Sequence, residues 1–378
     1  MRVLLVLPTY LPETFGGAEQ QTRKLSAALS ARGAEVTILT PCIGKLTPRQ
    51  ESAGAVRIHR LRQPHLPNLG GRYMLSFLTW TLRSAAWIAR RGGSYDVVHV
   101  IHGRLHAVGP LLGAAFARKP SLVKIGRGGG HFDLGVVRKK KLIGPLCAWL
   151  IERLTTGFVA NSREIAEDLE ARGVPQSKVH RIPNGVVMPL PETARRRNEA
   201  VRRFVYLGRL DSEKALDLMI DGFAELPGDV PAELILVGEG DCGPSLKAQA
   251  ARRGIEGRIR FAGRVEDVAP CLAEADFYVS TSTSEGMSNA LLEAMSHSVP
   301  PLTSHVSGVS DIVEDGVTGL LFAPGNRHAF VDRLREALAL SREEREAMGR
   351  AAAERVRMHY GMDHIADLHM KLYSALVR

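Results

Sequence analysis

Apolar runs of strand length alternate with helical segments along most of the chain. The runs in the first half are MRVLLVLP, EVTILTP, VRIHRLR, YDVVHVIH, SLVKIG and TGFVANS. Stretches with helical periodicity, such as AEQQTRKLSAALSARG, lie between them. Because strands and helices alternate in this way, the pattern predicts an α/β fold with a mostly parallel sheet.

The alternation pauses at residues 183–200 and then begins again. This stretch, PNGVVMPLPETARRRNEA, is rich in Pro, Asn, Gly and Arg, which is typical of a linker. Six more strand-like runs follow it: RFVYLGRL, AELILVGEG, RIRFAGRV, DFYVSTST, PPLTSH and TGLLFAP. We therefore expect two doubly wound domains, residues 1–188 and 189–360, that face a ligand-binding cleft. Residues 361–378 predict a C-terminal helix that packs back on the first domain.

Positive charge is concentrated in the first half of the chain. The 378 residues carry a net charge of +10, but residues 1–188 hold 27 Lys+Arg and 11 Asp+Glu, a net of +16. The rest holds 23 and 29, a net of −6. A basic first domain is typical of a protein that meets nucleic acid, anionic lipid or a phosphorylated substrate.

The cysteines and the hydropathy pattern bear on the compartment. The four cysteines lie far apart and form no C-x-x-C pair, so neither a disulfide scaffold nor a zinc site is expected. The sequence contains no secretory signal and no run of about 18 apolar residues. We expect a cytoplasmic protein without a membrane span.

The stretch SEGMSNALLEAM places two acids, Glu285 and Glu293, around the expected start of a helix near Ser288. Eight helical residues span about 12 Å, which is too far for a paired carboxyl site of about 5–9 Å. The small residues between the acids allow backbone N–H groups to bind phosphate at the helix N-terminus. The acids can then contact the two ends of a nucleotide diphosphate-sugar. Alternatively, Glu285 only favours the helix dipole, and Glu293 is a solvated helix residue.

Two further stretches suggest phosphate contacts. In GRLDSEKALDL, Arg209 and Lys214 follow a strand and can converge on a diphosphate, stabilising the charge that develops as it leaves. They can also be surface cations, with Asp211-Ser212 as a helix cap. In FGGAEQ, Gly16-Gly17 precede a helix and allow close approach of a phosphate, although a turn without a ligand is an equal alternative. This is not G-x-G-x-x-G, so a nicotinamide site is not supported.

Taken together, FGGAEQ, VANSREIAEDL, IPNGV, GRLDSEK, LVGEGD, FAGRVEDV and the acid pair resemble the family 4 glycosyltransferases. The resemblance covers nearly the whole chain. It implies a GT-B fold of two Rossmann-like domains and a retaining transfer of sugar from a UDP-, GDP- or ADP-sugar. The acceptor would be a glycan or a polyprenyl-linked hydroxyl in bacterial exopolysaccharide, capsule or lipopolysaccharide assembly. No cofactor or metal is implied, and the absence of D-x-D from the sequence agrees.

The resemblance also implies roles for particular residues. Arg209 and Lys214 would bind the donor diphosphate, Glu285 the sugar and Glu293 the ribose. The other donor-binding residues would be Gly16, Gly17, Gly238, Val265, Gly286, Met287, Ser288 and Asn289. Glu285, Arg209, Lys214 and His131 are the expected catalytic residues, with His102 and Arg127 on the acceptor side.

The sequence departs from the family pattern at two places. The family's glycine after the lysine of GRLDSEK is Ala215 here. The active-site histidine is displaced by a glycine run in KIGRGGGHFDL, so His131 and His102 are both candidates for it. His99, His102 and His106 lie close together, but we expect one buried and two solvated imidazoles rather than a metal site.

Two stretches of the first domain place basic residues beside apolar ones. They are GRYMLSFLTWTLRSAAWIARRGG, residues 71–93, and VVRKKKLIGPLCAWLIERL, residues 136–154. This combination suits an anionic membrane surface, so we expect an enzyme that binds peripherally to the inner face of the plasma membrane. Ordinary helix packing with solvated cations, and a soluble acceptor, remain the alternatives.

Two other functions compete with glycosyl transfer. A sugar-nucleotide epimerase of similar architecture would need groups placed for proton transfer at the sugar, and the motifs above disfavour it. A nucleic-acid-binding protein is suggested by the pI of 9.7. However, recognised binding modules are missing from the sequence, and the second domain is acidic. We expect no nucleic-acid partner.

Overall fold

The structure is a computed structural model that describes residues 1–44, 47–64, 74–128, 132–141, 143–189 and 200–377. The chain forms two compact units. The N-terminal unit comprises residues 1–185 and 362–378, and the C-terminal unit comprises residues 186–361.

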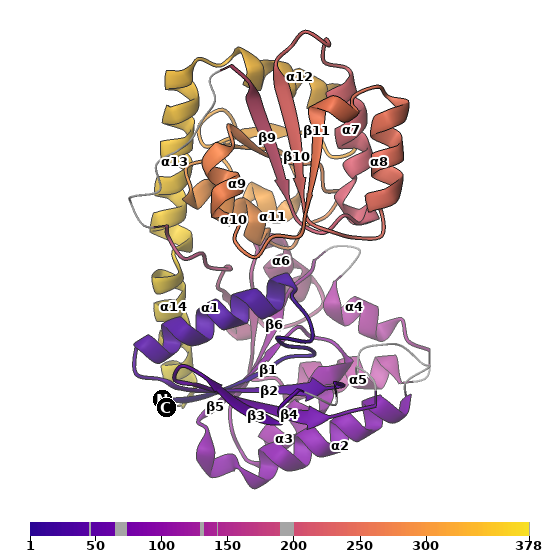
Figure 1. The fold of residues 1–378 in the computed structure, drawn as a ribbon. Coiled ribbons are helices and arrows are strands. Elements are labelled where there is room, and N and C mark those ends of the chain that lie inside the picture. Colours follow the sequence, from indigo (N-terminus) through magenta and orange to yellow (C-terminus); the bar gives the residue numbers. More distant parts are fainter. Residues whose placement is uncertain (45–46, 65–73, 129–131, 142, 190–199, 378) are drawn as a thin grey trace. The chain divides into compact units, whose positions relative to one another are not determined.

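The N-terminal unit is built on an eight-stranded sheet (Figure 1). Its strands are β1 (Arg2–Val6), β2 (Glu35–Cys42), β3 (Gln50–Ala53), β4 (Val56–Arg62), β5 (Val97–Ile101), β6 (Ser121–Ile125), β7 (Gly157–Ala160) and β8 (Val179–Arg181). They lie in the order β3-β4-β2-β1-β5-β6-β7-β8, and every pairing is parallel except β3 with β4. The central strands are buried on both faces, which explains their continuous apolar runs.

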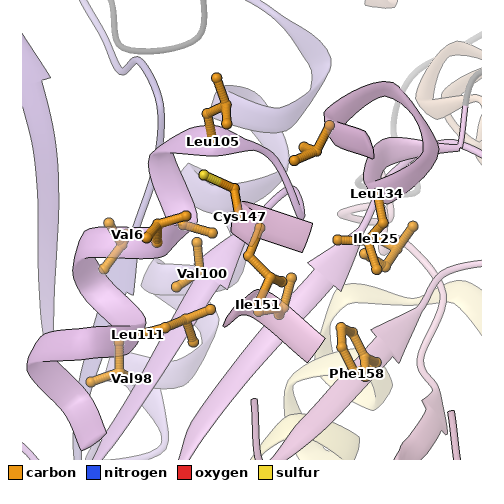
Figure 2. Close-up of a cluster of buried hydrophobic side chains, with 14 of the residues drawn as sticks. Val6, Val98, Val100, Leu105, Leu111, Ile125, Leu134, Cys147, Ile151 and Phe158 are labelled. Carbon is orange, nitrogen blue, oxygen red and sulfur yellow. The ribbon is translucent and has the colours of Figure 1, made fainter. Parts of the chain in front are cut away.

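Helices cover both faces of this sheet. They are α1 (Gly17–Ala31), α2 (Met74–Arg90), α3 (Val108–Phe116), α4 (Asp133–Arg138), α5 (Gly144–Leu154), α6 (Arg163–Ala171) and α14 (Met362–Val377). Side chains of α2, α3 and α5 pack on one face, and those of α1 and α14 pack on the other. Figure 2 shows part of the first of these cores, where Cys147 and Ile151 of α5 meet Val100 of β5 and Phe158 of β7.

The C-terminal unit has a second, fully parallel sheet of six strands. The strands are β9 (Arg202–Leu207), β10 (Ala232–Val237), β11 (Ile259–Gly263), β12 (Phe277–Ser280), β13 (Pro301–Ser304) and β14 (Leu320–Phe322), in the order β11-β10-β9-β12-β13-β14. The helices are α7 (Leu216–Ala224), α8 (Gly243–Arg252), α9 (Ala269–Glu274), α10 (Asn289–Ser296), α11 (Ser307–Ser310), α12 (Arg327–Ala339) and α13 (Arg342–Tyr360). The predicted class, two Rossmann-like α/β folds, is confirmed, and the six expected runs are the six strands.

The sequence pattern missed the strands β3 and β8. β3 has the sequence QESA and is almost entirely exposed, so no apolar run marks it. β8 has only three residues, and none of them is fully buried. Both strands lie at the edges of the sheet, where burial on two faces does not select apolar side chains.

Buried polar groups lie where helix α14 packs on the sheet of the N-terminal unit. The Nδ1 atom of His99, on β5, lies 2.7 Å from the Tyr373 hydroxyl, and the imidazole of His369 stacks on that of His99. The Lys124 ammonium donates to Asn184 Oδ1 at 2.7 Å. All of these groups are buried, and burial lowers the pKa of His369 to about 3 and that of Lys124 to about 8.

This cluster predicts a pH-dependent stability. The pKa of His369 is about 3 in the folded chain and about 6.5 when unfolded, so folding favours the neutral imidazole. Its contribution is fully present above pH ~6.5 and is lost as the pH falls toward 3. We expect the free energy of unfolding to fall on the order of a few kcal/mol over this range, as measured by urea denaturation.

His369→Leu should flatten this dependence, because it removes one buried titrating group. His328→Leu, at an exposed histidine, should leave it unchanged. If the free energy of unfolding falls equally with pH in both variants and in the unsubstituted chain, another group controls the acid transition.

Candidate active site

Two loops at the carboxyl edge of the C-terminal sheet touch through their backbones. A Cβ atom on Gly238 would lie 1.9 Å from the carbonyl oxygen of Gly208, and both glycines have φ values, +141° and +151°, that disfavour other residues. The Leu210 amide donates to the Glu239 carbonyl at 2.9 Å. The loop after β9 is therefore fixed against the loop after β10.

The expected donor-binding residues follow four neighbouring strands. Arg209 follows β9, Gly238 follows β10, Val265 follows β11 and Glu285 follows β12. Since these strands are adjacent and parallel, their carboxyl ends meet at one edge of the sheet. The structure thus brings these four positions to the same edge.

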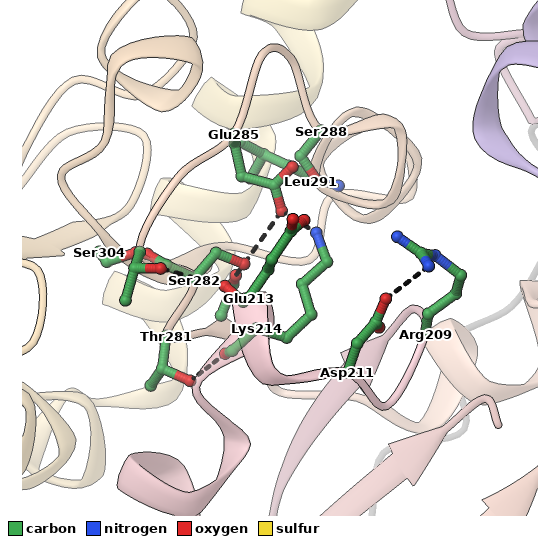
Figure 3. Close-up of polar contacts among 12 residues, drawn as sticks. Arg209, Asp211, Glu213, Lys214, Thr281, Ser282, Glu285, Ser288, Leu291 and Ser304 are labelled. Carbon is green, nitrogen blue, oxygen red and sulfur yellow. Dashed lines mark hydrogen bonds and ion pairs between the residues drawn. The ribbon is translucent and has the colours of Figure 1, made fainter. Parts of the chain in front are cut away.

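Lys214 and Glu285 form an ion pair at this edge (Figure 3). Lys214 ends a short 3-10 turn (Ser212–Lys214), and its ammonium bonds Oε1 of Glu285. The Ser282 hydroxyl donates to the same oxygen at 3.0 Å. Only 18% of the Lys214 side chain and 15% of the Glu285 side chain are exposed, so the pair is shielded from bulk water. A cation suited to phosphate and an acid suited to a sugar hydroxyl are therefore in direct contact.

Thr281 holds the turn that carries Lys214. Its hydroxyl donates to the carbonyls of Lys214 and Ala215, at 3.0 and 2.9 Å. Ala215 itself adopts a left-handed conformation, with φ +46° and ψ +44°. Glycine, which the family pattern expects at this position, would adopt these angles without the strain that an L-residue has there. Thr281 and Ser282 were not predicted, although they belong to the polar run that ends β12.

Arg209 is the more exposed of the two expected phosphate-binding cations. Its side chain is 64% exposed, and its Nη1 atom lies 2.5 Å from Oδ2 of Asp211. Asp211 occupies the N-cap position of the 3-10 turn, as the alternative expected, but its side chain makes no capping hydrogen bond. The Tyr206 hydroxyl donates to the Arg209 carbonyl at 2.8 Å and fixes the backbone beneath this guanidinium.

Helix α10 starts where the sequence predicted. Ser288 is its N-cap, and its hydroxyl accepts a hydrogen bond from the Leu291 amide at 3.3 Å. Met287 is buried against the core, which ties the loop Gly286–Asn289 to the body of the unit. Glu285 lies in the loop before α10, and Glu293 lies half-buried on the helix. The two acids therefore flank the helix N-terminus.

In the N-terminal unit, Gly16 is the N-cap of α1 and Gly17 is its first residue. A Cβ atom on Gly16 would lie 2.5 Å from Oε2 of Glu19. Glu19 is buried and accepts hydrogen bonds from the hydroxyls of Thr9 and Thr14, at 2.5 and 2.8 Å. Glu19 was not predicted, and its position explains the need for glycine at residue 16 without any ligand.

His102 lies at the carboxyl end of β5 and is oriented by a buried acid. Its Nδ1 atom is 3.4 Å from Oδ2 of Asp133, which also accepts from Arg104 Nε at 2.9 Å and from the Gly126 amide at 2.9 Å. Burial alone would raise the pKa of Asp133, but His102, Arg104 and the Gly126 amide outweigh it and hold that pKa well below its usual range. A Cβ atom on Gly126 would lie 2.4 Å from the His102 ring, so this glycine makes room for the imidazole.

The other histidines of the N-terminal unit need one correction. His99 and His106 are both fully buried, so the expectation of one buried and two solvated imidazoles is wrong. Each contributes to packing, with His106 bonded to the Ile101 carbonyl. His131 lies outside the described residues, and Arg127 lies half-buried directly after β6. Within the described ranges, no three His, Cys, Asp or Glu side chains are grouped to hold a metal ion.

Comparison with known proteins covers both units. A model for the glycosyl transferase 4-like domain matches residues 16–185, and a model for glycosyl transferases group 1 matches residues 201–339. Glycogen synthase of Mycobacterium tuberculosis is 26% identical over 401 residues, which cover 100% of this chain and 95% of that protein.

Two more known proteins are similar to this chain over its whole length. Phosphatidyl-myo-inositol mannosyltransferase of Mycobacterium leprae is 26% identical over 389 residues, covering 100% of this chain and 97% of that protein. The crystal structure of HepE from Anabaena in complex with UDP-glucose has a TM-score of 0.76 at 19% identity, with both chains covered completely.

The two domain matches define a glycosyltransferase that uses a nucleotide-sugar. The chain belongs to family 4 of these enzymes, which retain the anomeric configuration of the sugar, and it has the GT-B fold.

The left-handed Ala215 predicts an unusual stabilising substitution. Ala215→Gly should raise the free energy of unfolding by about 0.5–1 kcal/mol, because glycine adopts this conformation without steric strain. Urea denaturation of the purified chain measures the change. Ala248→Gly, at an exposed position inside helix α8, should instead lower stability by about 1 kcal/mol. A loss of stability in both variants would contradict the strain at Ala215.

Proposed function

We propose that this chain transfers a sugar from a UDP-sugar to a hydroxyl of a lipid-linked acceptor, with retention, in the assembly of a bacterial surface glycan. The part of this proposal that concerns the donor rests on one observation, the shielded Lys214–Glu285 ion pair beside the N-terminus of α10. HepE, whose structure contains UDP-glucose, has the same fold, which supports UDP as the nucleotide.

In this proposal, Lys214 exchanges its partner when the donor binds. Its ammonium moves from Glu285 to the diphosphate, where Arg209 provides the second positive charge. Glu285 is then free to accept a hydrogen bond from a sugar hydroxyl. Backbone amides at the start of α10 bind the phosphates, and Glu293 on that helix binds the ribose. Gly16, Gly17, Gly238 and Val265 complete the proposed donor contacts.

The transfer then proceeds on one face of the sugar. The bond between the anomeric carbon and the diphosphate oxygen breaks, and Lys214 and Arg209 stabilise the charge on the leaving group. The acceptor oxygen bonds to the anomeric carbon from the same face, and its proton passes to the departing phosphate oxygen. Configuration at the anomeric carbon is therefore retained.

His102 is the described histidine best arranged for the acceptor side. Asp133 bonds its Nδ1 atom and leaves Nε2 available, and 27% of the side chain is exposed. His131 and Arg127 belong to the segment that follows the next strand, β6, and remain part of the proposal.

Measurements of UDP affinity and of turnover should distinguish the role of Lys214 from that of Glu285. We expect Lys214→Met to lower the affinity for UDP at least tenfold in calorimetry, because it removes a phosphate contact. Glu285→Gln should leave UDP affinity within about threefold but lower turnover at least a hundredfold, since UDP lacks the sugar. Glu293→Ala should weaken UDP binding. All measurements include EDTA.

Lys247→Met is the matched control, because Lys247 is an exposed lysine on α8 of the same unit. It should bind UDP as the unsubstituted chain does. Undiminished affinity and turnover in the Lys214, Glu285 and Glu293 variants together would exclude this site as the donor site.

The N-terminal unit exposes apolar side chains on the helices that cover one face of its sheet. On α2, α3 and α5, they are Leu75, Leu78, Leu82, Leu112, Phe116, Leu146 and Trp149. The basic run 138–141 begins at the last residue of α4 and continues into the segment that leads to α5. Among the described helices, none is long and apolar enough to span a bilayer. This combination supports a peripheral contact with an anionic inner-leaflet surface, and hence a lipid-linked acceptor.

Vesicle binding tests this contact. The double variant Leu146→Ser/Trp149→Ser should reduce sedimentation with phosphatidylglycerol vesicles at least fivefold, because these side chains are 59% and 55% exposed on α5. The control Met358→Ser, at a 54% exposed residue of the C-terminal unit, should have no effect. If the unsubstituted chain does not sediment with anionic vesicles at low salt, the membrane proposal fails.

A further inference from the structure

A cavity of about 440 Å³ lies between β3, β4 and α2 of the N-terminal unit. Six of the residues that line it are arginines: Arg49, Arg60, Arg62, Arg83, Arg90 and Arg91. His59 and Trp87 also line it, whereas no aspartate or glutamate does among the described residues. The cavity shares no residue with the proposed donor site.

Four of the six arginines, Arg49, Arg83, Arg90 and Arg91, are not neutralised by any acidic side chain of the described residues. Arg60 is buried and pairs with Glu51 at 2.7 Å, but its Nε atom has no hydrogen-bond partner among the described residues. Arg83 donates to the Arg62 carbonyl at 2.6 Å, a contact that leaves its charge uncompensated. In the described part of the chain, Arg49, Arg83, Arg90 and Arg91 form no ion pair.

The aromatic and imidazole side chains order the cavity wall. The Arg91 guanidinium lies 4.5 Å from the centre of the Trp87 ring, and the His59 ring lies 5.2 Å from that of Trp87. Burial, followed by the charges of Arg91 and Arg57, lowers the pKa of His59. The wall is therefore positive and held in place without a ligand.

We infer that this arginine-lined cavity binds the phosphate or diphosphate group of an anionic ligand. Guanidinium groups bond phosphate oxygens in pairs, and several of them in one small volume repel one another until an anion binds. The inference concerns a second site and does not depend on the proposed transferase activity.

Two sources can supply this phosphate group: a free phosphate compound or the headgroup of a lipid. Helix α2 distinguishes between them. Leu82 lines the cavity and is 70% exposed. Leu75 and Leu78 precede it at helical spacing and are 69% and 47% exposed. A lipid phosphate in the cavity would place its hydrocarbon beside this face, whereas a free phosphate would not use it.

Calorimetry with pyrophosphate on the full chain tests the site. Arg49 and Arg90 are exposed, and their side chains form no hydrogen bond or ion pair in the described structure, so Arg49→Gln/Arg90→Gln removes two charges without removing such contacts. We expect this variant to lower pyrophosphate affinity at least tenfold. The control Lys247→Gln/Arg252→Gln removes two exposed charges from α8 and should not change the affinity.

Lys214→Met separates this site from the proposed donor site. It should leave the arginine-dependent binding intact, while Arg49→Gln/Arg90→Gln should leave UDP affinity intact. The pKa of His59, followed by NMR, should rise when pyrophosphate binds. Equal pyrophosphate affinities in the unsubstituted chain and in Arg49→Gln/Arg90→Gln would overturn the inference.

Vesicles containing phosphatidic acid identify the source of the phosphate. Binding that is lost in Arg49→Gln/Arg90→Gln and also in Leu75→Ser/Leu78→Ser/Leu82→Ser supports a lipid headgroup. If pyrophosphate binding is lost in Arg49→Gln/Arg90→Gln but vesicle binding is unchanged in Leu75→Ser/Leu78→Ser/Leu82→Ser, the ligand is a free phosphate compound.

Discussion

The contact between the backbones of Gly208 and Gly238 is the constraint on which the candidate site depends. No side chain fits between these loops, because a Cβ atom on Gly238 would lie 1.9 Å from the Gly208 oxygen. The chain after β9 therefore turns along the sheet edge, and Thr281 at the end of β12 bonds the turn from the other side. Lys214 meets Glu285 as a result of these two attachments.

The sequence predicts those parts of the fold in which burial requires apolar side chains. Parallel strands covered on both faces read as apolar runs, and so β9, β10, β12, β13 and β14 of the second sheet were predicted. The edge strands β3 and β8 were not, because exposure leaves their side chains free to vary. The contact between Lys214 and Glu285, which are 71 residues apart, depends on strand order, which no local pattern contains.

The same reasoning explains the supporting residues that were missed. Asp133 orients His102 only because β5 and β6 are neighbours and α4 begins beside their ends. No sequence pattern marks Ser282 or Glu19. Their roles are recognised only from the groups that they contact in the structure. The strand ends thus indicated the positions of the candidate site residues, whereas the partners of each charged group could be identified only in the structure.

The N-terminal unit is completed by a helix, α14, that follows the C-terminal unit in the sequence. Its core includes Ile365 and Tyr373 of α14, although residues 186–361 form the other unit. The N-terminal unit can therefore bury these two side chains only after the ribosome has synthesised the whole of the C-terminal unit.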